Sequence, residues 1–368
     1  MTVVLTPGER AAFKSCRRAW DLGAPGRRNL EPARADDTPD RDRLIRDALA
    51  VYYFPGMWDW PRGVVLPLVT QALEKGLDRQ PRPALDDERA ALRRLLGGYF
   101  DWAPTIEGLA PVLVEVDYEV DLPDSDRPDV ALRTRAGDNV RYRGRIDLLA
   151  VDEHDAYWIV RHRVVERWTP VESLVRDEET VAACWAWEQF YLGMAIAGTI
   201  HNELRVPDDA LEPEVRPGPT PGPTSTHQRG LPQSEGSGGG RSVPMHRRLY
   251  AKSSEPEEPE QVAVDLGPWF RRTWIRRRRA EIDNAGRQLV IEARHILDPD
   301  VTVYPSPSKE ACRHCAFATP CRELYEGGDA EIILAGDYRP RAPEELVEGR
   351  LGGMTWSTGR GAAPPAFS

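Results

Sequence analysis

Three cysteines lie close together near the carboxyl-terminal end of the chain, in the segment CRHCAFATPC. Cys312, Cys315 and Cys321 form a C-x2-C-x5-C array. Two thiolates at the first of these spacings can bind one metal ion or cluster, because a tight turn brings both sulfurs to the same side. Such spacing in a chain without an export signal predicts a thiolate metal centre rather than disulfides.

A centre of this kind needs a fourth ligand. Cys16 is the candidate because it lies in the polar, arginine-flanked segment KSCRRAW. Cys184, in AACWAWEQF, is expected to be a small buried apolar residue instead. His314 lies between two of the cysteines and can in principle bind zinc, but a solvent-facing role is expected. The residue types alone leave iron–sulfur and zinc both open.

A second group of residues that could do chemistry lies on two neighbouring strand-like segments, VRYRGRIDLLAV and AYWIVRHRVV. Asp147 closes a Gly-x-x-Asp pattern on the first segment. If the loop between the segments centres on His154, Asp147 lies opposite Arg161 and Arg145 lies opposite Arg163. Alternate residues of a strand share a face, so Arg161 and Arg163 point to the same side and His162 points to the other.

Together these features resemble the RecB-like branch of the PD-(D/E)XK nucleases, which includes AddB-type helicase-nucleases and CRISPR-associated iron–sulfur exonucleases. The resemblance is carried by the distant Cys16, by YPSPSKEACRHCAFATPC and by GRID, and it covers residues 5–20, 111–197 and 300–325. It implies an α/β fold with a central mixed sheet flanked by helices, plus a C-terminal cysteine-cluster module. It also implies a [4Fe–4S] cluster bound by Cys16, Cys312, Cys315 and Cys321. The implied partners are DNA and a helicase or other DNA-processing protein, in repair, recombination or defence.

The family's metal site uses the aspartate of Gly-x-x-Asp and an acid-x-Lys on the next strand. Asp147 matches the aspartate, whereas Arg161 and Arg163 occupy the places of the acid and the lysine. A guanidinium has no acceptor atom and is permanently charged, so it neither binds Mg²⁺ nor acts as a base. The expectation is a degenerate, inactive nuclease site in which Asp147 and Arg161 form a cross-strand ion pair.

Two other functions stay open at this point. The first is an active Mg²⁺- or Mn²⁺-dependent nuclease in which Asp147 binds the metal and Glu115, Asp117 or Glu119 supplies a substitute ligand. The second is a zinc-stapled structural or interaction protein with no role on nucleic acid. Brown colour and absorbance near about 400 nm would separate thiolate-bound iron from zinc alone.

Residues 267–297 predict one long helix, because four apolar residues recur at sevenfold spacing: Ile275, Ile282, Leu289 and Ile296. Its first third is rich in arginine, and these guanidiniums could contact phosphates, with Trp269 or Trp274 available for base stacking. The arginines concerned are Arg271, Arg272 and Arg276–Arg279. The alternative is a solvated face that pairs with the acidic segment SSEPEEPE.

The chain has 368 residues and a formal net charge of −10, which argues against a general nucleic-acid coat. Helical patterns at 6–22, 40–103 and 170–197 surround three strand-like segments, an order typical of α/β or α+β proteins. The expected organisation is a nuclease-like core with the amino-terminal cysteine (1–205), a disordered insertion rich in Pro, Gly, Ser and Glu (206–261) with a short strand at 247–252, a module of the arginine-rich helix and cysteine cluster (262–326), and a loose tail (327–368). No long apolar run and no signal-peptide pattern occur, which predicts a soluble, cytoplasmic protein.

Overall fold

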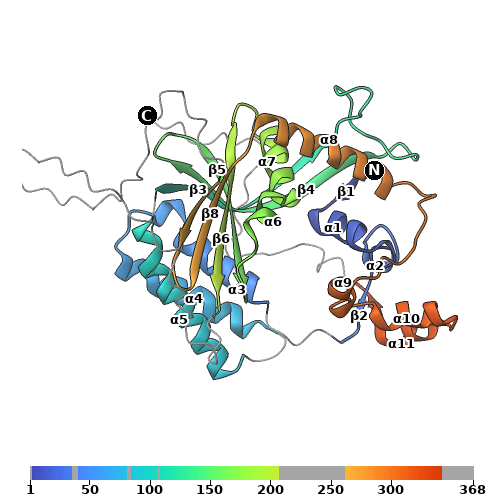
Figure 1. Ribbon diagram of the computed structural model, residues 1–368, viewed down its shortest axis with the longest axis horizontal. Helices are drawn as coiled ribbons and strands as arrows, with labels where there is room; N and C mark the ends of the chain where they lie inside the picture. The colour runs from blue at the N-terminus through green and yellow to red at the C-terminus, as the bar shows by residue number, and fades with distance from the viewer. Residues whose placement is uncertain (1, 35–39, 81–83, 107, 207–261, 342–368) are drawn as a thin grey trace, which may run out of the picture.

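The protein is an α/β structure in which helices cover both faces of a large mixed β-sheet (Figure 1). This computed structural model describes residues 2–34, 40–80, 84–106, 108–206 and 262–341. The predicted fold class, a central mixed sheet flanked by helices, is confirmed. Residues 207–261 lie outside the described residues, and with them all of the predicted insertion except residue 206, including its strand at 247–252. The predicted tail is described only up to residue 341.

Seven strands form the main sheet of the described residues, in the order β1-β4-β5-β6-β8-β7, with β3 paired to β4. Their bounds are β1 Thr2–Leu5, β3 Leu109–Asp121, β4 Asn139–Asp152, β5 Tyr157–Val165, β6 Ile196–Arg205, β7 Val262–Leu266 and β8 Phe270–Arg276. The antiparallel meander β3-β4-β5 was predicted. Strands β1 and β6, which pair in parallel with β4 and β5, were not. Each lies far in sequence from its partner or behind a helix, so no local hairpin signal marks it.

The register of β4 and β5 is the predicted one, since Leu148 pairs with Val160 and Val151 with Tyr157. This pairing starts at Leu148, the residue that follows Asp147, so Asp147 has no partner residue on β5. Strand β3 pairs with one edge of β4 between Arg141 and Asp152. Strand β1 pairs with the other edge only up to Tyr142. Residues 143–147 of β4 therefore border an opening between β1 and β5.

Three helices cover one face of the sheet: α3 (Arg41–Tyr52), α4 (Arg62–Asp78) and α5 (Asp86–Trp102), with short 3₁₀ turns η1 (Pro55–Met57) and η2 (Ala103–Thr105). Helix α3 starts at Asp40, whose side chain accepts a hydrogen bond from the Arg43 backbone N–H. Its buried residues pack with α4, α5 and the sheet in one apolar cluster. This packing fixes α3 beside β5 and brings Arg46 to the opening.

The other face carries α6 (Val171–Val175), α7 (Glu178–Phe190) and α8 (Arg279–Ile296). Helix α7 is apolar around most of its surface because it is enclosed by the sheet and α8. Gly286 of α8 lets the two helices approach, since a Cβ at this position would lie 2.3 Å from the Trp185 indole nitrogen. Ile282, Leu289 and Ile296 form the buried stripe of α8, as predicted.

The prediction of a single helix over 267–297 is wrong in its first third, because this part forms the end of the β7-β8 hairpin. Successive residues of β8 point to opposite faces, and each face buries an arginine. Arg271 pairs with Glu203 of β6, while Arg272 donates to the Tyr53 and Tyr99 hydroxyls. Charged residues at buried strand positions hide the alternating pattern by which a strand is recognised.

An amino-terminal part (7–32) and a carboxyl-terminal part (309–340) of the described residues meet beside the sheet (Figure 1). The amino-terminal part forms α1 (Pro7–Ser15), α2 (Arg17–Gly23) and β2 (Leu30–Pro32). The carboxyl-terminal part forms α9 (Lys309–Arg313), α10 (Ala318–Glu326), α11 (Ala330–Asp337) and β9 (Tyr338–Pro340). Strand β2 pairs with β9, and Leu22, Phe317 and Leu334 form a small core between the two ends.

Two predictions for the chain ends need correction. The helix expected at 6–22 is interrupted at Cys16, whose backbone is extended with a φ of −158°. The tail expected to be loose from residue 327 is a helix and a strand up to residue 340, because Leu334 buries its side chain in the small core. Among the described residues, no helix is long and apolar enough to cross a membrane.

Candidate functional site

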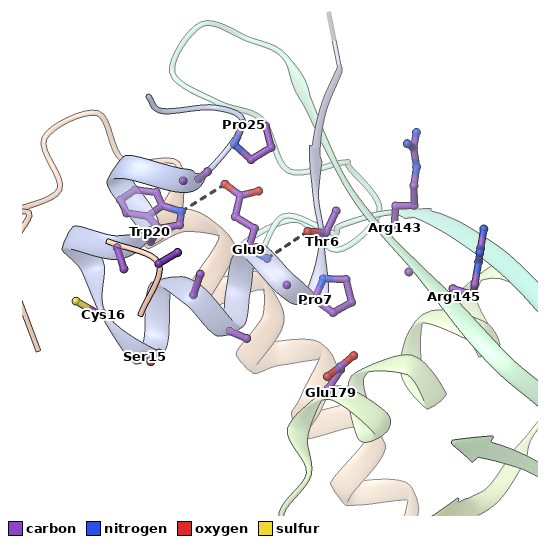
Figure 2. Close-up of a pocket in the computed structure, with 18 of the residues that line it drawn as sticks. Thr6, Pro7, Glu9, Ser15, Cys16, Trp20, Pro25, Arg143, Arg145 and Glu179 are labelled. Atoms are coloured by element: carbon purple, nitrogen blue, oxygen red, sulfur yellow. Dashed lines mark hydrogen bonds between the residues drawn. The ribbon is translucent and has the colours of Figure 1, made fainter. Parts of the chain in front are cut away.

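A cleft with a volume of about 2010 Å³ lies between the open part of the sheet and the amino-terminal and carboxyl-terminal parts that pack beside it. Its lining includes the buried acids of β3 and β4 at one end and four of the cysteines at the other. Figure 2 shows Cys16 on one side of this cleft and Arg143, Arg145 and Glu179 on the other. The structure thus brings both sequence-predicted groups, the carboxylate site and the cysteine site, to one continuous surface.

Asp147 of β4 lies in the gap where β5 leaves β4. Its side chain is 7% exposed, and Oδ2 accepts a hydrogen bond of 2.8 Å from the His162 backbone N–H. The His162 N–H, which has no backbone acceptor on β4 because the pairing of the two strands stops at Leu148, is thus satisfied by the Asp147 carboxylate. Burial raises the pKa of Asp147, although the charge of Arg46, 3.8 Å from Oδ1, acts in the opposite direction.

Glu115 of β3 faces Asp147 from the other side. Val114 pairs with Leu148 and Val116 with Ile146, which places Glu115 opposite Asp147. Glu115 has a φ of +46°, a left-handed conformation that is strained for a residue with a side chain. Its Oε1 is buried and has no hydrogen-bond partner among the described residues. Burial and the charge of Asp147 raise the pKa of Glu115 to about 8, against the effect of Arg145, so this carboxyl is protonated at neutral pH.

Arg161 and Arg163, at the positions of the family's acid and lysine, both form ion pairs with the start of α7. Arg161 Nη1 lies 2.6 Å from Glu179 Oε1, and Arg163 Nη2 lies 3.1 Å from Asp177 Oδ2. Asp177 also caps α7, accepting from the backbone N–H groups of Glu179 and Thr180. The expected ion pair between Asp147 and Arg161 is replaced by these contacts, because α7 presents acids closer to the guanidinium than β4 does.

The remaining predicted ligands, Asp117 and Glu119, are already paired with arginines. Asp117 Oδ1 is 2.7 Å from Arg145 Nε, and Glu119 is paired with Arg141 and Arg143 on the exposed part of the strands. Among the described residues, no group of three or more His, Cys, Asp or Glu side chains could hold a metal ion in this arrangement. The carboxylate end thus offers two facing carboxyls and nearby guanidiniums.

His162 lies on the opposite face of β5, as predicted. It is buried, stacks on Tyr53 with ring centroids 5.6 Å apart and shares a 2.9 Å hydrogen bond with Asn202. Burial lowers the pKa of His162 to about 3, with a further contribution from Arg272. A histidine that is neutral at all physiological pH values and enclosed in the core has a structural role.

At the other end of the cleft, the thiols of Cys16, Cys312 and Cys321 lie within electrostatic range of Cys315. Burial raises the pKa of Cys315, and these three neighbouring thiols raise it further. Two of the sulfurs accept hydrogen bonds: Cys16 Sγ from the Ser306 backbone N–H at 3.4 Å and Cys321 Sγ from Arg18 Nη1 at 3.8 Å. A bound metal or cluster would relieve the repulsion between neighbouring thiolates, and N–H donors directed at sulfur would stabilise these ligands.

All four cysteines fit such a group by donor type, although in the described residues they do not form a compact set of ligands. Cys312 is exposed on the five-residue helix α9. The two residues not chosen as ligands lie as predicted: Cys184 is fully buried, with its pKa raised to about 12 by burial, and His314 is exposed.

The arginines predicted to contact nucleic acid are mostly engaged inside the protein. Arg271 and Arg272 are buried, which corrects their assignment as phosphate ligands. The Arg276 guanidinium lies over the Trp158 ring at 5.3 Å, and the exposed Arg279 pairs with Glu188 and Asp283. Other arginines line the cleft instead: Arg18, Arg43, Arg46 and Arg322.

Sequence reasoning missed three side chains that shape the carboxylate end: Arg46, Asp177 and Glu179. The two acids had a recognisable signal, since they stand in the first turn of the helix that follows the arginine strand. Arg46 had none, because its approach to Asp147 depends on how α3 packs on the sheet. In comparisons with known proteins, no family model matches this chain, and no curated protein matches it.

Proposed function

We propose that this protein is an iron–sulfur member of the RecB-like PD-(D/E)XK group that binds DNA and has lost nuclease activity. One observation carries the proposal: a single cleft joins the four cysteines to Asp147, and at that site Arg161 and Arg163 are held in ion pairs by α7. The cysteines support the lineage, while the arginines support the loss of cleavage.

The order of elements agrees with a nuclease-like core. A helix (α3) precedes three antiparallel strands (β3, β4, β5), and after α7 the chain returns in β6, parallel to β5. Asp147 lies where β4 and β5 separate. Cys312 lies on α9, Cys321 lies on α10 and Cys315 lies in the turn between these helices, and together they form the proposed cluster module.

Loss of cleavage follows from the charges around Asp147. Phosphodiester hydrolysis of this type needs a divalent cation held by carboxylates. Here the buried Glu115 is protonated at neutral pH and Arg46 lies 3.8 Å from Asp147. Arg46 near Asp147 and Arg145, 3.5 Å from Glu115 Oε2, thus place the protein's own positive charge where a metal would have to bind.

The cluster, when bound, would offset part of the negative charge of the four thiolates and connect the amino-terminal and carboxyl-terminal parts. Cys16 follows α1, and the other three ligands follow the segment after α8. Arg18, Arg43 and Arg322 would contact the phosphates of DNA in the cleft, supplying salt-dependent affinity.

The test is anaerobic purification of the full chain, followed by iron and acid-labile sulfide analysis and absorbance near about 400 nm. We expect about four irons per chain in the wild type, loss of iron in Cys16→Ser and retention in the matched control Cys184→Ala. DNA binding is measured on single and double strands over a salt series, and cleavage is measured with Mg²⁺ or Mn²⁺. Zinc in place of iron, or no DNA binding, would overturn the proposal.

A second function is favoured by one observation, the buried carboxyl of Glu115 opposite Asp147. An active nuclease with rearranged ligands would use this pair: Glu115 and Asp147 would hold the metal, and the Glu115 proton would be released to solvent. Cleavage that stops on chelation and in Asp147→Asn would establish it.

A further inference from the structure

We infer that Arg10 is a positioning residue for the cysteine site, holding Cys16 in place through a clamp of two cations and two carboxylates on three helices. This inference rests on the proposed four-cysteine function and deepens it. The clamp consists of Arg10 and Lys14 of α1, Glu178 of α7 and Glu292 of α8.

Arg10 is the buried member of the clamp, with its side chain 5% exposed. Its Nε donates to Glu292 Oε2, its Nη2 lies 3.1 Å from Glu178 Oε2, and its Nη1 donates to the Glu178 backbone carbonyl at 3.4 Å. One guanidinium thus binds two helices at once. Because its donors form a rigid planar fork, the position and direction of α1 are both fixed.

Lys14 completes the clamp one helical turn later. Its Nζ pairs with Glu178 Oε2 and lies 3.0 Å from Glu292 Oε1. Arg10 and Lys14 stand four residues apart and so lie on the same face of α1. Both acids are shared between them, which leaves the clamp neutral. Two residues after Lys14 the helix ends at Cys16.

The same helices also position the chain that leads to the other three cysteines. After α8, residues 301–306 run back along α1 and α2. The Arg18 backbone N–H donates to the Tyr304 carbonyl at 3.2 Å, and the Arg17 guanidinium lies 4.9 Å from the Tyr304 ring centroid. The Ser306 backbone N–H reaches the Cys16 sulfur. Displacement of α1 would therefore move Cys16 and the approach to Cys312 together.

The clamp also lies next to the carboxylate site. Glu178 directly precedes Glu179, which pairs with Arg161 at the start of α7. Arg10 thus connects the two ends of the cleft through one turn of helix. A purely local role for Arg10 in stability would not make the cysteines depend on it.

The experiment compares Arg10→Gln with Arg89→Gln in the full chain. Arg89 also bridges two carboxylates, Glu74 and Asp78, at 2.6 and 2.7 Å, but on helices remote from the cysteines. In the reduced, metal-free protein, a short bismaleimide joins Cys16 to a cysteine of 312–321, and mass spectrometry follows the rate. We expect this rate to fall at least about threefold in Arg10→Gln, because it follows the effective concentration of the two thiols. It should be unchanged in Arg89→Gln.

The anaerobically purified protein gives the second readout. Release of iron to a chelator, measured well below the unfolding temperature, should be at least about threefold faster in Arg10→Gln than in the wild type or Arg89→Gln. Lys14→Gln changes an exposed side chain and should therefore fold. It should act in the same direction more weakly, and it tests the inference if Arg10→Gln does not fold.

The outcomes separate the two proposals. Wild-type protein without iron would overturn the proposed function, whereas the cross-linking rates would still report on the clamp. Iron in the wild type together with unchanged cross-linking and unchanged iron release in Arg10→Gln and Lys14→Gln would overturn this inference alone.

Discussion

Glu115 and Asp147 present two carboxyl groups to each other in a place from which water is largely excluded. Such a pair cannot be doubly ionised without cost, because two like charges at short range repel strongly where little solvent screens them. The strained backbone of Glu115 aims its side chain into this position. Strain that is retained at one residue marks a site where orientation matters more than local stability.

The pH dependence of stability should reveal this pair. The folded pKa of Glu115 is about 8, above its unfolded value of 4.5, so the folded state binds the extra proton between these values. This stabilisation is fully present below pH 4.5 and is lost as the pH rises toward 8. Glu115→Gln cannot lose a proton, so at pH 8 its free energy of unfolding should exceed that of the wild type by more than about 1 kcal/mol.

Chemical denaturation at pH 5 and pH 8 measures this difference. Glu119→Gln is the control, because its pKa is lowered by Arg141 and Arg143 despite the opposing effect of burial. That variant should gain nothing at pH 8. Parallel pH profiles for the wild type and Glu115→Gln would contradict the raised pKa.

The arginine pair gives the second residue-scale prediction. Arg161→Asp with Arg163→Lys restores the family's acid and lysine beside Asp147 and Glu179. Without metal, the added acid should lower the unfolding temperature through repulsion. Mg²⁺ or Mn²⁺ should raise it again, since a ligand that binds only the folded state stabilises it. The wild type should not respond, and neither should Arg143→Asp, which changes an exposed arginine of the same sheet. Metal-dependent cleavage by the double variant would show that the rest of the site is intact; no thermal response to metal would show that it is not.

At the scale of elements, the contact between α7 and α8 depends on Gly286. The usual effect of Gly→Ala in a helix is stabilisation by up to about 1 kcal/mol. Gly286→Ala should instead destabilise by about 1–3 kcal/mol, because the new methyl group meets the Trp185 indole in a filled core. Gly97→Ala in α5, where nothing lies within 4 Å, should show the ordinary gain. Thermal or urea unfolding distinguishes the two signs; equal effects would mean that α7 and α8 can separate without cost.

The sequence was informative where the elements are amphipathic and local. The meander, its register around His154 and the buried stripe of α8 follow from periodicity, which depends only on neighbouring residues. Strand β8 was wrongly predicted as helix because its arginines have partners on β6, on α5 and directly after α3, and no local pattern encodes those partners. Cys16 was selected from its polar neighbours as the candidate fourth ligand, and it lies near Cys315, whereas the position of Arg46 depends on the packing of α3.

For the whole molecule, the cysteine site should couple the two ends of the chain. If a cluster is bound, its removal by a chelator should lower the unfolding temperature and speed proteolysis within 300–341. The reason is that a cluster bound only by the folded state adds its binding free energy to the stability of this region. Cys16→Ser should behave like the chelated protein, and Cys184→Ala should keep the metal and its protease resistance. Differential scanning fluorimetry and timed digestion report these changes; identical digestion with and without chelator would contradict the coupling.

The pairing of β2 with β9 has a consequence for the time course of synthesis. Strand β1 waits for residues 139–142, and β2 waits for residues 338–340. A chain that emerges from the ribosome at about 5–20 residues per second completes its central sheet while β2 still lacks its partner strand. Cys16, which lies between β1 and β2, is likewise made long before its neighbours Ser306 and Cys315, so its thiol meets them only when that later part of the chain has emerged.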